Sequence, residues 1–199
     1  MMDDKTLYAA LPRLLVPWYA QNKRDLMWRN SRDPYRVWIS EIMLQQTRVE
    51  AVIGYYARFL AALPDVFALA AAPEADLLKL WEGLGYYSRA RNLQKAAKVL
   101  VEERNGVFPR TAAELEKLPG IGAYTAGAIA SICFDQPTAA VDGNVLRVVS
   151  RVMGSETPID EPSVKKEMTA NLSAVYPTGH CGDFTQSFMD LGSGVCTPR

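Results

Sequence analysis

The sequence has few cysteines, a single histidine and no long hydrophobic run. Its three cysteines, Cys133, Cys181 and Cys196, are too far apart for a disulfide framework or a local zinc site, and they fit a reducing compartment. No apolar run reaches about 18 residues, the length of a membrane span. The N-terminus carries acids where a secretory signal carries bases. We therefore expect a soluble, intracellular protein with no membrane partner.

A surplus of basic residues is also absent. The 22 lysines and arginines are balanced by 22 aspartates and glutamates, so the net charge gives no support to nucleic-acid binding. The charges are nevertheless uneven, because acidic residues collect in 102–116 and 156–167. The stretch 86–98 contains no acid and carries the basic residues Arg89, Arg91, Lys95 and Lys98. That stretch is either a nucleic-acid-binding surface or an ordinary solvated helix face, and its charge leaves both open.

Sustained alternation of apolar and polar residues, which marks half-buried strands, is missing as well. The pattern is helical nearly throughout, and the sequence therefore predicts an all-α fold. With 199 residues, of which 49% are hydrophobic, the chain is long enough to bury a sizeable core. Composition does not decide between one large domain and two small ones.

Helix start and stop signals divide the chain into short helices. Asp33 and Pro34 open one of them, because an aspartate side chain caps free amides and a proline at the first position loses no hydrogen bond. Pro12 and Pro17 predict bends or an early end in the first helix. The expected helices cover residues 5–21, 34–44, 47–62, 73–82, 88–104, 123–134, 142–153, 162–175 and 183–192.

Two stretches have the spacing of a capping box, in which a threonine and a glutamate three residues later satisfy free amides at a helix start. Thr47 and Glu50 form the first, which makes residues 45–46 a break between two helices. Thr111 and Glu114 form the second, shortly before a turn that contains two glycines.

This turn, LPGIG at residues 118–122, lies between two expected helices. It begins at Leu118. Gly120 and Gly122 let the backbone approach a phosphate closely and point amides at it, helped by the N-terminus of the following helix. Such a turn would hold DNA without reading its sequence. Pro-Gly also occurs in many ordinary helix-helix turns, so the turn alone leaves a purely structural role open.

The continuation of the turn strengthens the DNA-binding interpretation. AYTAGAIA allows close helix packing, and Asp142 follows in VDGNVLRV. Together these features resemble the helix-hairpin-helix, Gly/Pro…Asp superfamily of base-excision DNA glycosylases and, within it, the adenine DNA glycosylases of the MutY type. Five stretches in the family's order carry this closer resemblance: WRNSRDPYRVWISEIMLQQTRVE, LWEGLGYYSRARNL, LPGIGAYTAGAIAS, AVDGNVLRV and MDLGSGVCTPR.

Two positions separate this family from the similar endonuclease III type, which also cleaves the DNA backbone. Endonuclease III-like enzymes carry a lysine after the hairpin that forms a Schiff base with the sugar, and the corresponding residue here is Tyr124. Glu41, in SEIMLQQ, stands where that type does not normally have a carboxylate. The resemblance therefore implies a monofunctional enzyme that releases the base and leaves an abasic site.

The resemblance also implies the chemistry. Adenine leaves readily only if it is protonated while the sugar becomes an oxocarbenium ion. Glu41 would protonate N7 of adenine, and burial in its apolar helix would raise its pKa. Asp142 would face the cationic sugar and would also cap a helix. Asn144 and Tyr124 match positions that orient the carboxylates and water.

Reaching adenine inside a duplex requires extruding the base and filling the gap. Gln46 and Tyr86 match the family's wedge residues. Their expected neighbours at the same opening are Gln45, Thr47 and Leu84. Arg29 matches a residue near the adenine site, and Gln186 occupies a position that is Glu or Gln in relatives. Without the resemblance, the 45–46 segment reads as a polar loop and GLGYY as a buried turn with core aromatics.

The resemblance implies a [4Fe–4S] cluster in full-length relatives. Cys196 matches the first of its four thiolate ligands, and the other three are absent from the sequence. Cys133 and Cys181 do not match ligand positions. We therefore expect a truncated chain or fragment in which the cluster does not form. A Nudix-like C-terminal domain that recognises 8-oxoguanine is also absent, which predicts blunted mismatch discrimination.

The implied fold has two helical lobes. Residues 29–135 would form a six-helix barrel with the helix-hairpin-helix, and residues 1–28 with 136–199 a second lobe, the iron–sulfur lobe of the family, with DNA bound in the cleft between them. The implied partner is double-stranded DNA containing mispaired adenine, bound by a monomer in the cytoplasm or nucleoid. Two alternatives remain: a related glycosylase acting on another base, such as mismatched thymine, and a non-catalytic DNA-binding module.

Overall fold

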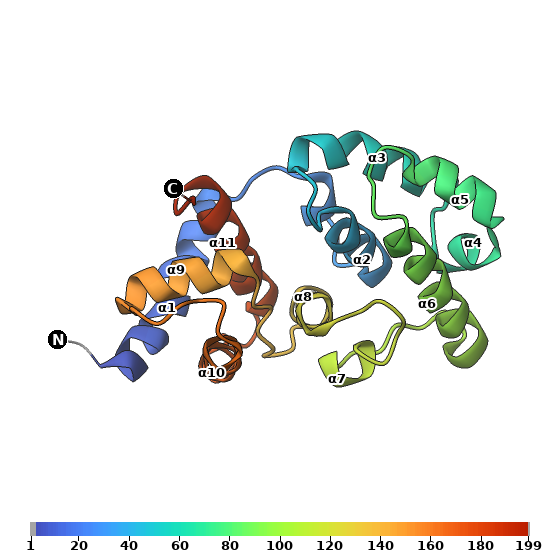
Figure 1. Ribbon diagram of the computed structural model, residues 1–199. Coiled ribbons are helices and arrows are strands. Elements are labelled where there is room, and N and C mark those ends of the chain that lie inside the picture. Colours follow the sequence, from blue (N-terminus) through green and yellow to red (C-terminus); the bar gives the residue numbers. More distant parts are fainter. Residues whose placement is uncertain (1–2, 199) are drawn as a thin grey trace. The chain divides into compact units, whose positions relative to one another are not determined.

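A computed structural model describes residues 3–198, and its regular elements are all helices (Figure 1). No residue of this range lies in a strand, so the predicted all-α class is confirmed. The chain folds as two compact units. One is Leu26–Thr125, and the other joins the N-terminal segment up to Asp25 to the chain from Ala126 onward. None of the described helices is long and apolar enough to cross a membrane.

The unit Leu26–Thr125 holds the middle helices of the chain. They are η1 (Met27–Arg29), α2 (Pro34–Met43), α3 (Val49–Ala62), α4 (Val66–Ala71), α5 (Glu74–Trp81), α6 (Ser88–Arg104), α7 (Ala112–Leu115) and the first residues of α8 (Ala123–Phe134). Helix α3 packs against α2 and α5, and α4 packs against α6. The packing core contains large aromatics, including Phe59 and Trp81 edge to face with ring centroids 6.0 Å apart.

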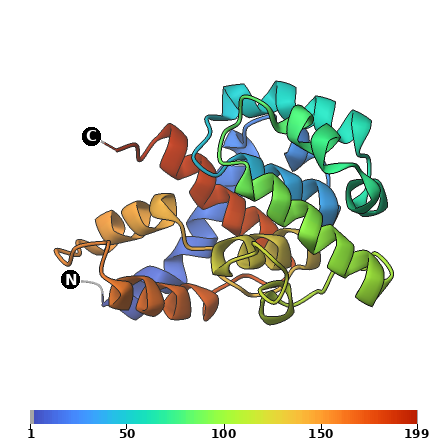
Figure 2. The ribbon, with the colours of Figure 1, turned by 45° about the vertical axis from the view of Figure 1, so that its right-hand side comes forward.

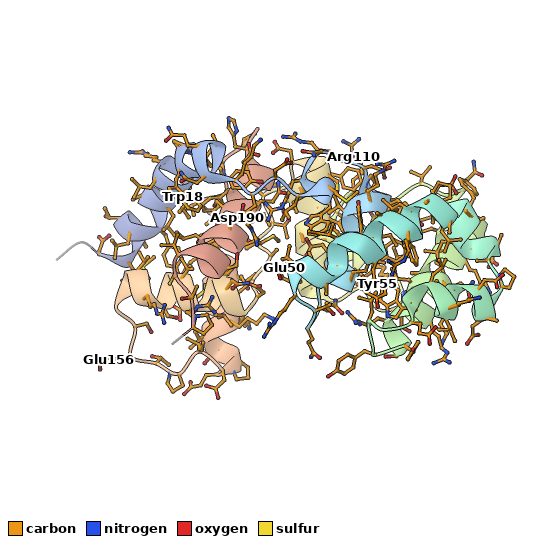
Figure 3. All side chains as sticks on the ribbon, turned by 90° about the horizontal axis from the view of Figure 1, so that it is seen from above. Trp18, Glu50, Tyr55, Arg110, Glu156 and Asp190 are labelled. Carbon is orange, nitrogen blue, oxygen red and sulfur yellow. The ribbon has the colours of Figure 1, made fainter. Side chains whose placement is uncertain are left out.

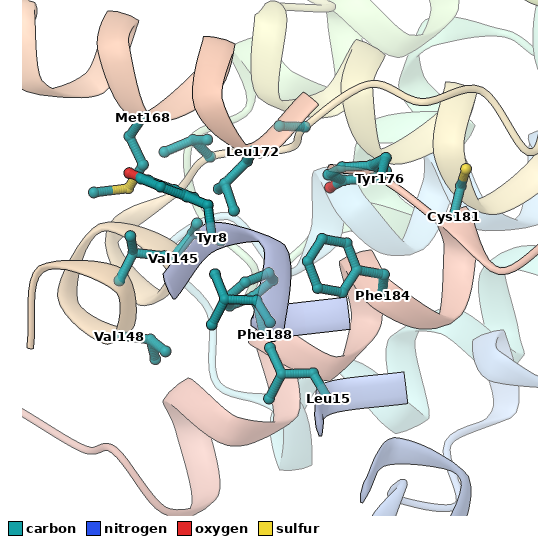
Figure 4. Packing of buried hydrophobic residues seen from close by; sticks show 14 residues of the cluster. Tyr8, Leu15, Val145, Val148, Met168, Leu172, Tyr176, Cys181, Phe184 and Phe188 are labelled. Atoms are coloured by element: carbon teal, nitrogen blue, oxygen red, sulfur yellow. The ribbon is translucent and has the colours of Figure 1, made fainter. Parts of the chain in front are cut away.

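The second unit brings the two ends of the chain together. It contains α1 (Asp4–Asn22), α9 (Gly143–Met153), α10 (Pro162–Ser173), α11 (Cys181–Gly194) and most of α8. Helices α1 and α11 run side by side, and α9 packs against both (Figure 2). Buried residues from α1, α9, α10 and α11, among them Tyr8, Val148, Leu172 and Phe184, form its core (Figure 4).

An ion pair fixes the end of α1 to α11. The Nε and Nη2 atoms of Arg24 each lie 2.8 Å from Oδ1 of Asp190, and the Arg24 backbone amide donates to Oδ2 at 3.2 Å. The Asp190 side chain, labelled in Figure 3, is 2% exposed. A buried carboxylate of this kind requires its partner, because an unpaired buried charge is strongly destabilising.

Helix α1 does not have the early end that its prolines predicted. Pro12 and Pro17 lie inside the helix, which continues to Asn22. Its buried residues Leu11, Leu15 and Tyr19 are four residues apart and form one apolar face. Each proline lacks a backbone N–H and so removes one hydrogen bond from the helix. Tertiary packing of the apolar face, against α11 among others, compensates for this loss of stability.

The predicted capping boxes are not formed as expected. Helix α3 begins at Val49 with Arg48 at the N-cap position and without a side-chain cap, so the box between Thr47 and Glu50 is wrong. The Thr47 hydroxyl faces the Gln45 carbonyl instead, at 3.4 Å. Thr111 does occupy the N-cap of α7, but its hydroxyl donates to the Glu114 carboxylate at 3.1 Å and it caps no backbone amide.

Other boundaries show what the sequence pattern missed. Helix α4 was not expected, although Asp65 caps it by accepting from the Ala68 amide at 2.8 Å. Helix α10 ends at Ser173, and α11 covers Cys181–Gly194, a longer helix than the one expected at 183–192. The boundaries of the two units also differ from the predicted limits of 29–135. The six-helix barrel and second lobe of the family remain a prediction.

Candidate functional site

Two turns in the unit Leu26–Thr125 carry strained residues. Gln46 has φ 58° and Tyr86 has φ 46°, in the left-handed region where non-glycine residues are uncommon. Both are exposed, and Tyr86 is 65% exposed despite its large ring. Such strain costs on the order of 1–3 kcal/mol per residue and is concentrated at functional sites. The two predicted wedge residues therefore have an unusual backbone and an outward position in common.

Their predicted neighbours lie in the same two turns. Gln45 and Thr47 are partly buried beside Gln46, and Leu84 is buried at 6% exposure beneath the second turn. The carbonyl oxygens of Gln45 and Leu84 accept hydrogen bonds from the same guanidinium, that of Arg89, at 2.7 and 2.9 Å. The structure thus brings the 45–47 and 84–86 segments together.

The glycine-containing turn at 118–122 joins α7 to α8, as the sequence predicts. Leu118 is buried, and Gly120 is required by the fold: it has φ 75°, and a Cβ there would lie 2.6 Å from Cβ of Asn92. Gly122 is different, because it is exposed and a Cβ there would meet nothing within 4 Å. No internal contact of the described chain requires a glycine at 122, which leaves its backbone open to an outside group.

Glu41 is a buried acid on α2. It is 6% exposed, and its neighbours along the helix, including Trp38, Ile39, Ile42 and Met43, are buried as well. The burial expected from the sequence is therefore observed. Burial by itself disfavours the charged form of a carboxyl group.

Asp142 is held at both carboxylate oxygens. Its Oδ1 accepts from the Val145 amide at 2.9 Å, which confirms the predicted N-cap of α9, and its Oδ2 accepts from Nδ2 of Asn144 at 2.9 Å. Arg147 in turn donates to Oδ1 of Asn144 at 2.8 Å and to the carbonyls of Gly192 and Cys196 at 2.7 and 2.8 Å. No sequence pattern indicates this role of Arg147, although the residue lies in VDGNVLRV.

The contact between α9 and α11 leaves no space for a side chain at Gly192. A Cβ at this position would lie 2.6 Å from Cβ of Asn144. We expect Gly192→Ala to displace Asn144 from Asp142 at a cost of about 1–3 kcal/mol of overpacking. Chemical denaturation should show this decrease in the free energy of unfolding. Gly194→Ala is the matched control, because its Cβ would meet nothing within 4 Å; equal stability of both variants would contradict the prediction.

The remaining predicted site residues are placed as follows. Arg29 ends η1 and Tyr124 is the second residue of α8, and both are partly buried. Gln186 is buried on α11, and its amide nitrogen donates to the Gly182 carbonyl of its own helix at 3.2 Å. Glu41, Arg29 and Tyr124 belong to one unit, whereas Asp142 and Gln186 belong to the other.

The cysteines of the described residues do not fit an iron–sulfur cluster by themselves. Residues 3–198 contain no group of three or more His, Cys, Asp or Glu side chains that could hold a metal ion. Sγ of Cys196 accepts from Arg151 at 3.1 Å, and Cys181 is fully buried in the core with its thiol directed at the Pro177 carbonyl. Burial raises the pKa of the Cys181 thiol to about 12, which disfavours the thiolate form that metals bind.

Comparison with known proteins identifies relatives along the whole chain. Residues 39–174 match the HhH-GPD superfamily of base excision DNA repair proteins. The chain is 48% identical to the adenine DNA glycosylase of Mus musculus over 208 residues, covering all of this chain and 40% of that protein. It is 41% identical to the adenine DNA glycosylase of Buchnera aphidicola subsp. Baizongia pistaciae over 183 residues, covering 92% of this chain and 52% of that protein. The chain thus spans about half or less of these relatives.

Solved structures show the same fold. A thermostable thymine-DNA glycosylase superposes with a TM-score of 0.85 at 28% identity, covering 98% of this chain and 88% of that one. A non-covalent endonuclease III–DNA complex superposes with a TM-score of 0.81 at 26% identity, covering 100% of this chain and 90% of that one.

Proposed function

The chain belongs to the HhH-GPD superfamily of base excision DNA repair proteins, and we propose that it is a monofunctional DNA glycosylase that excises adenine mispaired with 8-oxoguanine or guanine. The observation that carries the proposal is the buried Glu41 on α2, five residues before the strained, exposed Gln46. A proton donor and an element that enters the duplex thus follow each other along one short segment.

In the proposed reaction, Glu41 gives a proton to N7 of the extruded adenine. The N-glycosidic bond breaks with its electron pair moving to the base, and neutral adenine leaves. The ionised Asp142 stabilises the oxocarbenium ion electrostatically. Water then adds to C1′ and its proton returns to Glu41, so that adenine and an abasic site are the products.

Supporting groups keep these two acids in place. Asn144 donates to Oδ2 of Asp142 and fixes the orientation of this carboxylate. We assign Tyr124 to the same task of orienting the carboxylates and water. A tyrosine there supplies no amine for a Schiff base, so the DNA backbone stays intact.

The contacts with DNA are assigned to three places. The turn at 118–122 would hold a phosphate through the exposed backbone at Gly122. Gln46 and Tyr86 would fill the gap left by the extruded base, with Gln45, Thr47 and Leu84 supporting them. Arg29 and Gln186 are assigned to the vicinity of the base, and the enzyme would act as a monomer.

Thymine at a mismatch is the alternative substrate, and the similarity to a thymine-DNA glycosylase favours it. Adenine is preferred for a chemical reason, because its N7 carries a lone pair that Glu41 can protonate, whereas the ring nitrogen of thymine already carries hydrogen. The relatives named adenine DNA glycosylase are also more similar in sequence, at 41% and 48% against 28% identity.

A single-turnover assay on duplexes containing A opposite 8-oxoguanine, A opposite G, or T opposite G tests this proposal. We expect adenine release from the first two and strand cleavage only after alkali treatment, because no lysine Schiff base forms. Thymine release without adenine release would transfer the assignment to the alternative. Binding of the duplexes with no base release would leave a non-catalytic DNA-binding module.

A further inference from the structure

One half-buried arginine binds both strained turns. Arg89 lies in the first turn of α6, and its Nη1 donates to the carbonyls of Ile42, Met43 and Gln45 at 2.8, 3.2 and 2.7 Å. Its Nη2 donates to the carbonyls of Leu84 and Gly85 at 2.9 and 3.3 Å. A single guanidinium therefore connects the C-terminal end of α2 to the turn that precedes α6.

Two aromatic rings also lie beside this guanidinium. Its central carbon lies 5.4 Å from the ring centroid of Trp81 and 5.7 Å from that of Tyr86. Burial lowers the pKa of Arg89 from its ordinary value. The carbonyls at the end of α2 have no partners within the helix and carry partial negative charge, so they compensate the cation where a carboxylate would otherwise be needed.

Two of the accepting carbonyls belong to the residues directly before the strained ones. Gln45 immediately precedes Gln46, and Gly85 immediately precedes Tyr86. The φ angle of a residue is the rotation about the bond from its backbone nitrogen to its Cα. That nitrogen lies in the same peptide plane as the carbonyl of the preceding residue. By binding the carbonyls of Gln45 and Gly85, Arg89 fixes the two peptide planes against which the positive φ angles of Gln46 and Tyr86 are set.

Other contacts brace the second turn in the same way. Nε1 of Trp81 donates to the Gly85 carbonyl at 3.1 Å. Gly83 has φ 96°, and a Cβ there would lie 2.0 Å from the hydroxyl of Tyr55, which is labelled on α3 in Figure 3. The turn therefore packs against α3 as well as Arg89, and these tertiary contacts stabilise the strained backbone conformation of Tyr86.

We propose that Arg89 is a positioning residue for DNA insertion: it holds Gln46 and Tyr86 in the backbone conformations with which they enter the duplex and replace the extruded base. The inference rests on the proposed function, because it assumes that these two residues enter DNA. Arginine suits the role where lysine does not, since its planar fork presents five donors in fixed directions and reaches two segments at once.

The test compares Arg89→Lys with the wild-type chain on two substrates. One duplex has adenine opposite guanine, and the other has adenine opposite a synthetic abasic site, where extrusion is easier. Misplacement of a group by about 1 Å costs on the order of 10²-fold in rate, and we expect a loss of this size on the first duplex. On the second duplex we expect a loss of about threefold or less, because the cost of extrusion is smallest for an unpaired base.

Four further variants separate positioning from general destabilisation. Arg91→Lys makes the same chemical change in an exposed arginine of α6 that pairs with Glu74. Leu100→Val lowers the stability of the same unit in its buried core, away from both turns. Arg89→Gln, whose amide keeps two donors, serves where the lysine variant does not fold. Adding Arg89→Lys to a variant that already carries both Gln46→Ala and Tyr86→Ala should cause no further loss of activity, because both residues that Arg89 positions are then absent.

Equal losses of Arg89→Lys on the two substrates overturn the inference, since they indicate a purely structural role. A second measurement uses 2-aminopurine at the target position, whose fluorescence reports unstacking without base release. If the wild-type chain unstacks the base but releases no adenine, the proposed function is overturned. The inference still stands in that case, provided that Arg89→Lys unstacks the base poorly. Unstacking by Arg89→Lys at the wild-type level overturns the inference alone.

Discussion

Glu41→Gln is expected to slow adenine release by about 10²–10⁴-fold, the usual contribution of a general acid. Glutamine has nearly the same shape and cannot give up a proton, so the variant should bind DNA and unfold at the temperature of the wild-type chain. Single-turnover release from a duplex with A opposite 8-oxoguanine measures the effect. A rate equal to that of the wild-type chain would remove Glu41 from the mechanism.

Two comparisons make this experiment specific. Glu50→Gln is the matched control, because Glu50 is exposed in the first turn of α3 and should tolerate the change without loss of activity. A substrate with 7-deazaadenine lacks the nitrogen that Glu41 is proposed to protonate. On this substrate the wild-type rate should fall to that of Glu41→Gln, and a further decrease in the variant would indicate a second role for the acid.

Asp142→Asn is expected to lower the rate of adenine release by about 10²–10³-fold, as for removal of one preorganised electrostatic group. Asparagine is as good an N-cap as aspartate, so the bond from the Val145 amide can be kept. The bond from Asn144 is lost, at a cost of about 1 kcal/mol in the free energy of unfolding. Activity should thus fall far more than stability.

The chain supplies a matched control for this variant. Asp65 caps α4 in the same way, accepting from the Ala68 amide at 2.8 Å. Asp65→Asn should leave both the rate and the unfolding midpoint near their wild-type values. If Asp142→Asn behaved as Asp65→Asn does, Asp142 would be a helix cap only, and another anion would have to face the sugar.

Much of the helical framework was predictable, because its signals are local. Helices α6 and α8 have the predicted bounds, and α6 is followed by Asn105, which is its C-cap residue in the left-handed conformation. The N-cap roles of Asp33 and Asp142 were also predicted and are confirmed. Each of these features depends on residues within a few positions of one another.

Features that depend on distant partners were not predictable. Arg89 reads as one more cation in a basic stretch, because its carbonyl partners come from residues 42–45 and 84–85 and a charge pattern does not reveal them. The remaining basic residues of that stretch differ from it: Arg91, Lys95 and Lys98 are exposed. Arg147 was missed for the same reason, since two of its acceptors, Gly192 and Cys196, are remote in sequence.

Some features of the candidate site were also predictable from the sequence, and others were not. The sequence located Gln46 and Tyr86 by resemblance, but it contained no sign of their positive φ angles, because neither residue type favours that conformation. The burial of Glu41 followed from its apolar helical neighbours. The requirement for Gly120 comes from its packing against Asn92, a residue of α6, and no local pattern could reveal it.

The side-by-side packing of α1 and α11 has a consequence for synthesis of the chain. Protein is made from the N-terminus at about 5–20 residues per second, and units tend to fold as soon as they are complete. Helix α1 therefore emerges long before α11, its main packing partner, whereas the contacts of Leu26–Thr125 lie largely within that unit. Until translation reaches α11, Leu11, Leu15 and Tyr19 lack the surface that finally covers them, and the nascent chain displays an apolar stripe that chaperones could bind.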